Sequence, residues 1–152
     1  MAHWLMKSEP DTFGYPHLVA AGRAGWDGVR NLQARNFLRT MRVGDQAIFY
    51  HSSTSPPGAA GICTVVGAAE PDPTQFDPAS HYYDPTSDPA APRWDWVTVA
   101  PVRALRRYVP LAELRTIPEL AGSRLIARAN RLSVIPFTPA EFDAVVRASE
   151  SG

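Results

Sequence analysis

Residues 26 to 42, WDGVRNLQARNFLRTMR, predict a helix that begins beside a tryptophan and has two chemically different faces. Its apolar face repeats at helical spacing: Ala34, Phe37, Leu38 and Met41. A neighbouring polar face follows a similar spacing: Asn31, Arg35, Arg39 and Arg42. We expect Asn31 to cap the start of this helix and Gly44 to follow its end. The stretch therefore brings an aromatic ring and a row of guanidinium groups to neighbouring positions.

Two interpretations of this stretch remain open at the level of the residues. An aromatic ring beside arginines suits a surface that stacks a planar base and holds a phosphate. A buried tryptophan with a solvated arginine face is equally typical of an ordinary helix. Lys7 is the only lysine, and Ala, Pro and Gly are frequent, so codon usage accounts for part of the arginine preference.

The composition limits the classes of protein to which this chain can belong. Its 152 residues suffice for one domain with a real core, and 45% of them are hydrophobic. The net charge is zero, but carboxylates gather between Glu70 and Asp95 and arginines between Arg103 and Arg131. Cys63 is the only cysteine, which excludes an internal disulfide and a multi-cysteine zinc site. The histidines lack the close spacing of metal ligands, so we expect no metal and no cofactor.

Nothing in the sequence indicates a membrane protein. No apolar run approaches the roughly 20 residues that a membrane-spanning helix needs. The first residues also lack the pattern of a signal peptide. We therefore expect a cytoplasmic monomer without a membrane partner.

The order of elements predicts an α+β fold. Alternation and β-branched residues indicate strands over His3–Lys7, Gln46–His51, Gly61–Ala69, Arg93–Val102 and Ser133–Phe137. Besides the helix after Trp26, helices are expected over Tyr15–Gly22, Pro110–Leu114, Ser123–Ala129 and from Pro139 onward, with Thr138 and Glu141 as a capping box. The proline-rich stretch Glu70–Pro92 is expected to form an ordered loop. Such an order suggests one domain, residues 1–152, with a strongly curved mixed sheet or a small barrel.

Several motifs, in order along nearly the whole chain, resemble those of the EVE domain family: WLMKSEP (4–10), WDGVRNLQARNFLR (26–39), VGDQAIFYHS (43–52), PDPTQFD (71–77), PRWDWV (92–97) and RLSVIP (131–136). The resemblance implies a PUA-like fold, a small mixed β-barrel flanked by short α-helices. It also implies kinship with the YTH domain, which reads methylated adenine in an aromatic cage. A non-catalytic module that binds a modified base in DNA or RNA is then expected, above all a modified cytosine.

Residues carried over from the resemblance define an expected site. Trp26 stands where the cage tryptophan stacks on a flipped base. Ser8, Glu9 and Asp27 are expected to read the edge of the base, and Asn31, His51 and Ser52 to line the pocket. Phosphates of the nucleic acid are assigned to arginines: Arg35, Arg128 and Arg131. In this scheme a carboxylate such as Glu9 accepts a hydrogen bond from the exocyclic amine of cytosine.

Two further functions remain as alternatives. Some PUA-like relatives hydrolyse modified nucleosides, and here Lys7, Glu9 and His51 would supply a base and an electrostatic partner. No nucleophile elbow supports that hydrolase. An adaptor that binds proteins is the other alternative, and a pocket too shallow for a base would favour it.

Overall fold

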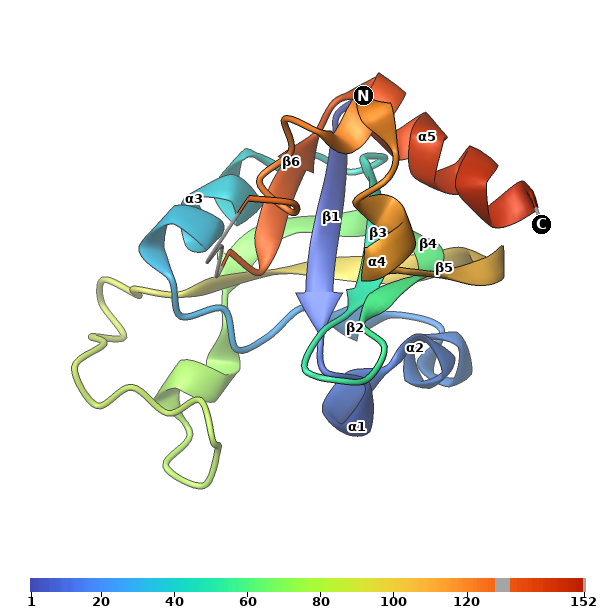
Figure 1. The fold of residues 1–152 in the computed structure, drawn as a ribbon. Coiled ribbons are helices and arrows are strands. Elements are labelled where there is room, and N and C mark those ends of the chain that lie inside the picture. Colours follow the sequence, from blue (N-terminus) through green and yellow to red (C-terminus); the bar gives the residue numbers. More distant parts are fainter. Residues whose placement is uncertain (128–131, 152) are drawn as a thin grey trace.

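The structure is a computed structural model that describes residues 1–127 and 132–151. Its centre is a six-stranded mixed sheet with the order β2-β5-β4-β3-β1-β6 (Figure 1). The strands are β1 (His3–Ser8), β2 (Ala24–Gly25), β3 (Gln46–His51), β4 (Gly58–Pro71), β5 (Asp95–Pro110) and β6 (Val134–Phe137). β1 and β3 run parallel, and every other pairing is antiparallel. The predicted α+β class is thus confirmed.

The expected closed barrel is replaced by an open, curved sheet. β2 and β6 are the two ends of the strand order, and no pairing joins them within the described residues. β4 and β5 are long and pair with register shifts at several points, where bulges bend and twist the strands. β2 spans only two residues, Ala24 and Gly25, so it offers almost no edge for closure.

The helices begin where the sequence supplies caps. In α3 (Leu32–Thr40), the side chain of Asn31 accepts a hydrogen bond from the Ala34 N–H at 2.9 Å. In α5 (Pro139–Glu150), Thr138 and Glu141 form the predicted capping box. Shorter helices complete the fold: α1 (Pro10–Phe13), α2 (Tyr15–Ala21), α4 (Leu111–Leu114) and the 3-10 turns η1 (Pro73–Phe76) and η2 (Pro118–Leu120).

The helix predicted over Ser123–Ala129 is wrong for the part that is described. Residues 124–126 form a turn, in which the Ile126 N–H donates to the Ser123 carbonyl at 3.1 Å. The Ser123 hydroxyl also accepts from the Leu125 N–H at 3.1 Å. Serine side chains compete in this way with helical hydrogen bonds.

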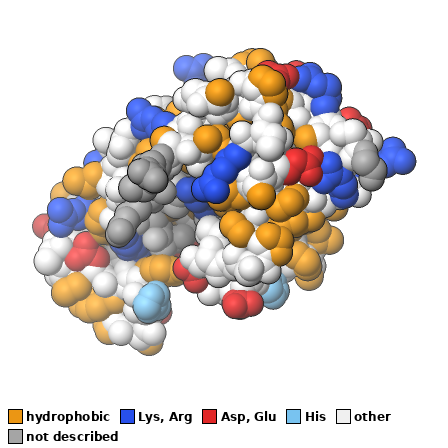
Figure 2. All heavy atoms as spheres, viewed as in Figure 1, with side chains coloured by type: hydrophobic (Ala, Val, Ile, Leu, Met, Phe, Trp, Pro, Cys, Tyr) orange, Lys and Arg blue, Asp and Glu red, His pale blue; other side chains and the backbone are white. Residues whose placement is uncertain are grey.

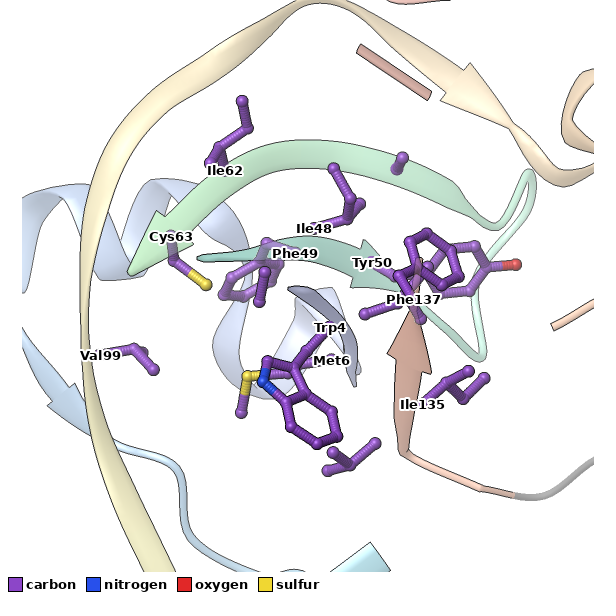
Figure 3. Close-up of a cluster of buried hydrophobic side chains, with 14 of the residues drawn as sticks. Trp4, Met6, Ile48, Phe49, Tyr50, Ile62, Cys63, Val99, Ile135 and Phe137 are labelled. Carbon is purple, nitrogen blue, oxygen red and sulfur yellow. The ribbon is translucent and has the colours of Figure 1, made fainter. Parts of the chain in front are cut away.

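The core lies under the parallel pair β1 and β3. Leu5, Ile48 and Phe49 are completely buried, and Figure 3 shows Phe49 and Ile48 among the side chains of neighbouring strands. Trp4 is also buried, and its Nε1 donates to a carboxylate oxygen of Asp45 at 3.1 Å. The Phe49 ring also meets the Trp26 ring edge-on, with centroids 5.2 Å apart. The packed core thereby supports one wall of the candidate site.

The acidic segment, Glu70–Pro92, is ordered as predicted and projects from the sheet (lower left in Figure 1). Gln75 is completely buried and organises it. Its amide nitrogen donates to the carbonyls of Asp72 and Trp94, both at 2.7 Å. Its amide oxygen accepts from the Ser87 hydroxyl at 2.6 Å and the Trp94 N–H at 3.0 Å. One satisfied amide therefore takes the place of regular structure in this segment.

Candidate functional site

A cavity of about 680 Å³ opens where β1 and β3 end. Its volume falls within the roughly 300–1,000 Å³ of ordinary ligand cavities. Figure 2 shows the surface hollowed between the projecting acidic segment and the rest of the molecule. The lining comes from the end of β1, α1, the chain after β2, the chain after β3, Tyr82 and Ser133: Lys7, Ser8, Glu9, Thr12, Phe13, Gly25, Trp26, Asp27, Gly28, Val29, Ser52, Ser53, Tyr82 and Ser133.

The parallel pairing of β1 and β3 brings their carboxyl ends together at the cavity. Beyond the last register pair, Ser8 with His51, the Ser52 N–H donates to the Ser8 carbonyl at 2.9 Å. The Ser8 hydroxyl donates to the Phe13 carbonyl at 2.6 Å and so fixes α1 against the strand end. Because that proton is already used, Ser8 can only accept a hydrogen bond from a ligand.

Trp26 is held rigidly on the cavity wall. Its N–H donates to the Val97 carbonyl at 2.8 Å, and its ring rests against Phe49. The side chain is only 6% exposed, yet no atom of the described residues accepts a hydrogen bond from its Nε1. Among the described residues, only His3 Nδ1 is both sealed from solvent and unpartnered. The Trp26 Nε1 is therefore reachable from the cavity and available to a ligand.

Two carboxylates on the lining, Glu9 and Asp27, are exposed and have no salt bridge to any described residue. Glu9 stands at the start of α1 without capping it through its side chain. Partial desolvation of its carboxylate, and then the charge of Asp72, raise the pKa of Asp27 above its ordinary value. Burial and then the charges of Asp27 and Glu9 raise the pKa of Tyr82, so its phenol stays protonated at neutral pH.

The Arg30–Asp72 cluster, which consists of Gly28, Arg30, Asp72 and Thr74, adjoins the cavity through Gly28. The completely buried Asp72 accepts from the Gly28 N–H at 2.9 Å, from Arg30 at 3.2 Å and from Thr74 N–H at 2.8 Å. Arg30 also donates to the Tyr82 carbonyl at 2.8 Å, and its guanidinium lies 5.6 Å from the centre of the Tyr82 ring. This cluster fastens the acidic segment to the chain after Trp26.

Tyr82 lines the cavity and contacts this cluster through Arg30. Gly28 has φ +76°, and a Cβ there would come within 2.5 Å of the Tyr82 ring. The glycine is therefore required both by its backbone conformation and by the ring lying on it. Tyr82, Arg30 and Asp72 were not among the residues predicted for the site. The Asp-Pro-Thr triplet at Asp72 was a usable signal, because Asp72 caps η1 in the manner that such triplets favour.

Of the residues predicted for the base, the structure brings five to the lining: Ser8, Glu9, Trp26, Asp27 and Ser52. Asn31 and His51 are not on it. Asn31 uses its side chain to cap α3. His51 accepts a hydrogen bond from the Tyr15 N–H through Nε2 at 3.1 Å, and burial lowers its pKa. Both side chains already have structural partners.

The arginines predicted for phosphate are also placed differently from the expected row. Arg35 donates to the Arg93 carbonyl at 2.8 Å and to the Asn36 side chain at 2.8 Å, away from the lining. Arg39 forms an ion pair with Asp95. α3 thus uses its arginines to hold the start of β5. Arg128 and Arg131 lie outside the described residues.

No group of three or more possible ligands could hold a metal ion in residues 1–127 and 132–151. None of the helices described is long and apolar enough to span a bilayer.

Comparison with known proteins identifies the family. Human thymocyte nuclear protein 1 is 42% identical over 168 residues, covering 98% of this chain and 74% of that protein. A Pseudomonas putida crystal structure superposes with a TM-score of 0.95 at 47% identity, covering 97% of this chain and 99% of that one. The structure of human THYN1 in complex with DNA containing 5-methylcytosine superposes with a TM-score of 0.91 at 41% identity, covering 100% of this chain and 99% of that one. The EVE domain model matches residues 2–148, and the chain belongs to the EVE domain family.

Proposed function

We propose that this EVE domain is a non-catalytic module that binds a modified cytosine in DNA, held out of its stack in the cavity beside Trp26. The observation that carries the proposal is the cavity of about 680 Å³ with a rigid, nearly buried indole on its wall. The human relative, solved with DNA that contains 5-methylcytosine, supports the same class of ligand.

The energetics agree with this assignment. Extracting a base from a stack costs a few kcal/mol, least in single strands. An aromatic platform returns roughly 1–3 kcal/mol per stacked base. Because Phe49 and the Val97 carbonyl already fix Trp26, little side-chain entropy is lost when a ligand binds.

Fluorescence anisotropy with a single-stranded oligonucleotide carrying one central 5-methylcytosine tests the proposal. Trp26→Ala should weaken binding about tenfold or more, because the stacking platform is lost. Trp26→Phe keeps most of the packing on Phe49, so its affinity should lie between those of the wild type and Trp26→Ala. Trp96→Phe is the matched control, since Trp96 is absent from the lining and its Nε1 donates to Glu70 at 3.1 Å. Wild-type affinity in both Trp26 variants would overturn the assignment.

Hydrolysis of a modified nucleoside is a second candidate, and one observation favours it. Lys7 and Glu9 both line the cavity, and burial lowers the pKa of Lys7. Against it, the Lys7 ammonium lies 5.9 Å from the centre of the Tyr50 ring, a residue that is not on the lining. Incubation with a panel of modified nucleosides, analysed by chromatography, decides the question. A product formed by wild type and lost in Glu9→Gln would support the hydrolase.

A further inference from the structure

We propose that the carboxylates of Glu9 and Asp27 make the cavity select cytosine bases, 5-methylcytosine included, against thymine and uracil. This inference rests on the proposed function and names how its site distinguishes bases. 5-Methylcytosine and thymine carry the same 5-methyl group. They differ at position 4, where cytosine has an amine that donates and thymine has an oxygen that accepts. A protein that binds 5-methylcytosine in DNA must make this distinction, because thymine is abundant.

The charge pattern of the lining carries the argument. Glu9 and Asp27 can only accept hydrogen bonds when ionised, and neither has a salt bridge within the described chain. Arg30, the nearest arginine in sequence to Asp27, is already paired with Asp72. The Ser8 hydroxyl donates its hydrogen bond to the Phe13 carbonyl, so it too presents an acceptor. This part of the wall therefore offers acceptors to whatever enters.

An independent observation points to a ligand in the same cavity. The Trp26 side chain is only 6% exposed, and its Nε1 has no acceptor among the described residues. Because this N–H is not sealed from solvent, an acceptor of a ligand that enters the cavity can pair with it. A nucleotide supplies one through its sugar and phosphate oxygens.

The consequence for base choice follows from the acceptors. An exocyclic amine satisfies a carboxylate, whereas the thymine or uracil oxygen would face its lone pairs and leave both groups unpaired. Such mismatches are penalised more than matched contacts are rewarded, since both partners have given up water. A good base-edge contact discriminates by a factor on the order of ten or more.

The test compares four oligonucleotides that differ only at one central position: 5-methylcytosine, cytosine, thymine or uracil. At fixed salt, wild type should bind the two cytosine forms roughly tenfold or more tightly than thymine and uracil. Asp27→Asn and Glu9→Gln replace an oxygen acceptor by an amide that can donate to the thymine oxygen. The ratio of 5-methylcytosine to thymine affinity should fall severalfold in at least one of them and approach one in the double variant.

A matched control separates base reading from general charge. Asp11→Asn removes the same charge from an exposed aspartate of α1 that is not on the lining. It should strengthen binding of all four oligonucleotides alike and leave the ratio unchanged. An unchanged ratio in the Glu9 and Asp27 double variant would overturn the inference while Trp26→Ala still weakened binding. Failure of the proposed function looks different, because Trp26→Ala would then bind every oligonucleotide as wild type does.

Discussion

Asp72 and Asp27 lie near one another in the fold and have opposite surroundings. Asp72 is completely buried, and its two oxygens accept from Gly28, Arg30 and Thr74. Asp27 is exposed on the cavity, and no cation among the described residues pairs with it. A buried carboxylate must be saturated to be tolerated, whereas an unsaturated one remains available for a ligand. Asp72 therefore stabilises the structure around the cavity, whereas the Asp27 carboxylate remains available to a ligand.

The largest effect should come from removing the two charges in turn. Asp72→Asn leaves the Arg30 guanidinium half-buried without its counter-ion, and breaking a buried pair costs about 3–5 kcal/mol. Asp27→Asn should change the free energy of unfolding by about 0.5 kcal/mol or less, as usual for surface positions. Urea unfolding of both variants measures the difference. Equal losses would show that the two aspartates do the same structural work.

The sequence predicts the helix caps and strand ends around the site better than it predicts which side chains line the cavity. Local signals were sufficient for the capping box at Thr138 and the N-cap at Asn31, because both depend on residues within one helical turn. The ends of β1 and β3 were also predictable from hydrophobic runs that stop at Ser8 and His51. The open sheet was not predictable, because closure depends on how far bulged strands bend and on whether the end strands meet.

Within the site, success and failure have a physical pattern. Ser8, Glu9, Trp26 and Asp27 were identified because they belong to continuous motifs at element ends. His51 also belongs to such a motif, but its hydrogen bond from Tyr15 is a long-range contact that a motif does not contain. Placing Tyr82 on the lining likewise required knowing that Arg30 donates a hydrogen bond to the Tyr82 carbonyl, 52 residues further along the chain. Long-range contacts of this kind have no local signature.

A second prediction sharpens the comparison within the acidic segment itself. Tyr82 lines the cavity, whereas its neighbour Tyr83 is 42% exposed and is not on the lining. Tyr82→Ala should weaken binding of the 5-methylcytosine oligonucleotide about tenfold, because an aromatic wall contributes roughly 1–3 kcal/mol. Tyr83→Ala should leave the affinity within about twofold, since substitutions at exposed sites have small effects. Anisotropy titrations of both variants test this, and equal affinities would remove Tyr82 from the site.

The smallest expected effect is on the pH dependence of stability. It compares Asp84, whose carboxylate accepts hydrogen bonds, with Asp27, whose carboxylate has no salt bridge to a described residue. Hydrogen bonds from Thr86 and Trp94 hold the pKa of Asp84 at about 2, so its stabilisation is present near neutral pH. It is lost as pH falls from the ordinary aspartate pKa of about 3.9 toward 2. The pKa of Asp27 is raised instead, by burial and by Asp72, so ionisation of Asp27 opposes folding at neutral pH and acid relieves it.

Thermal unfolding from pH 7 to pH 2 should therefore resolve two slopes of opposite sign. Relative to Asp27→Asn, the wild-type protein should gain stability on mild acidification, since protonation removes a charge that has no partner. Relative to Asp84→Asn, it should lose stability only below about pH 4, where the carboxylate that accepts from the Trp94 Nε1 at 2.7 Å becomes protonated. If both comparisons sloped the same way, Asp27 would have a partner when folded, and its availability to a base would be refuted.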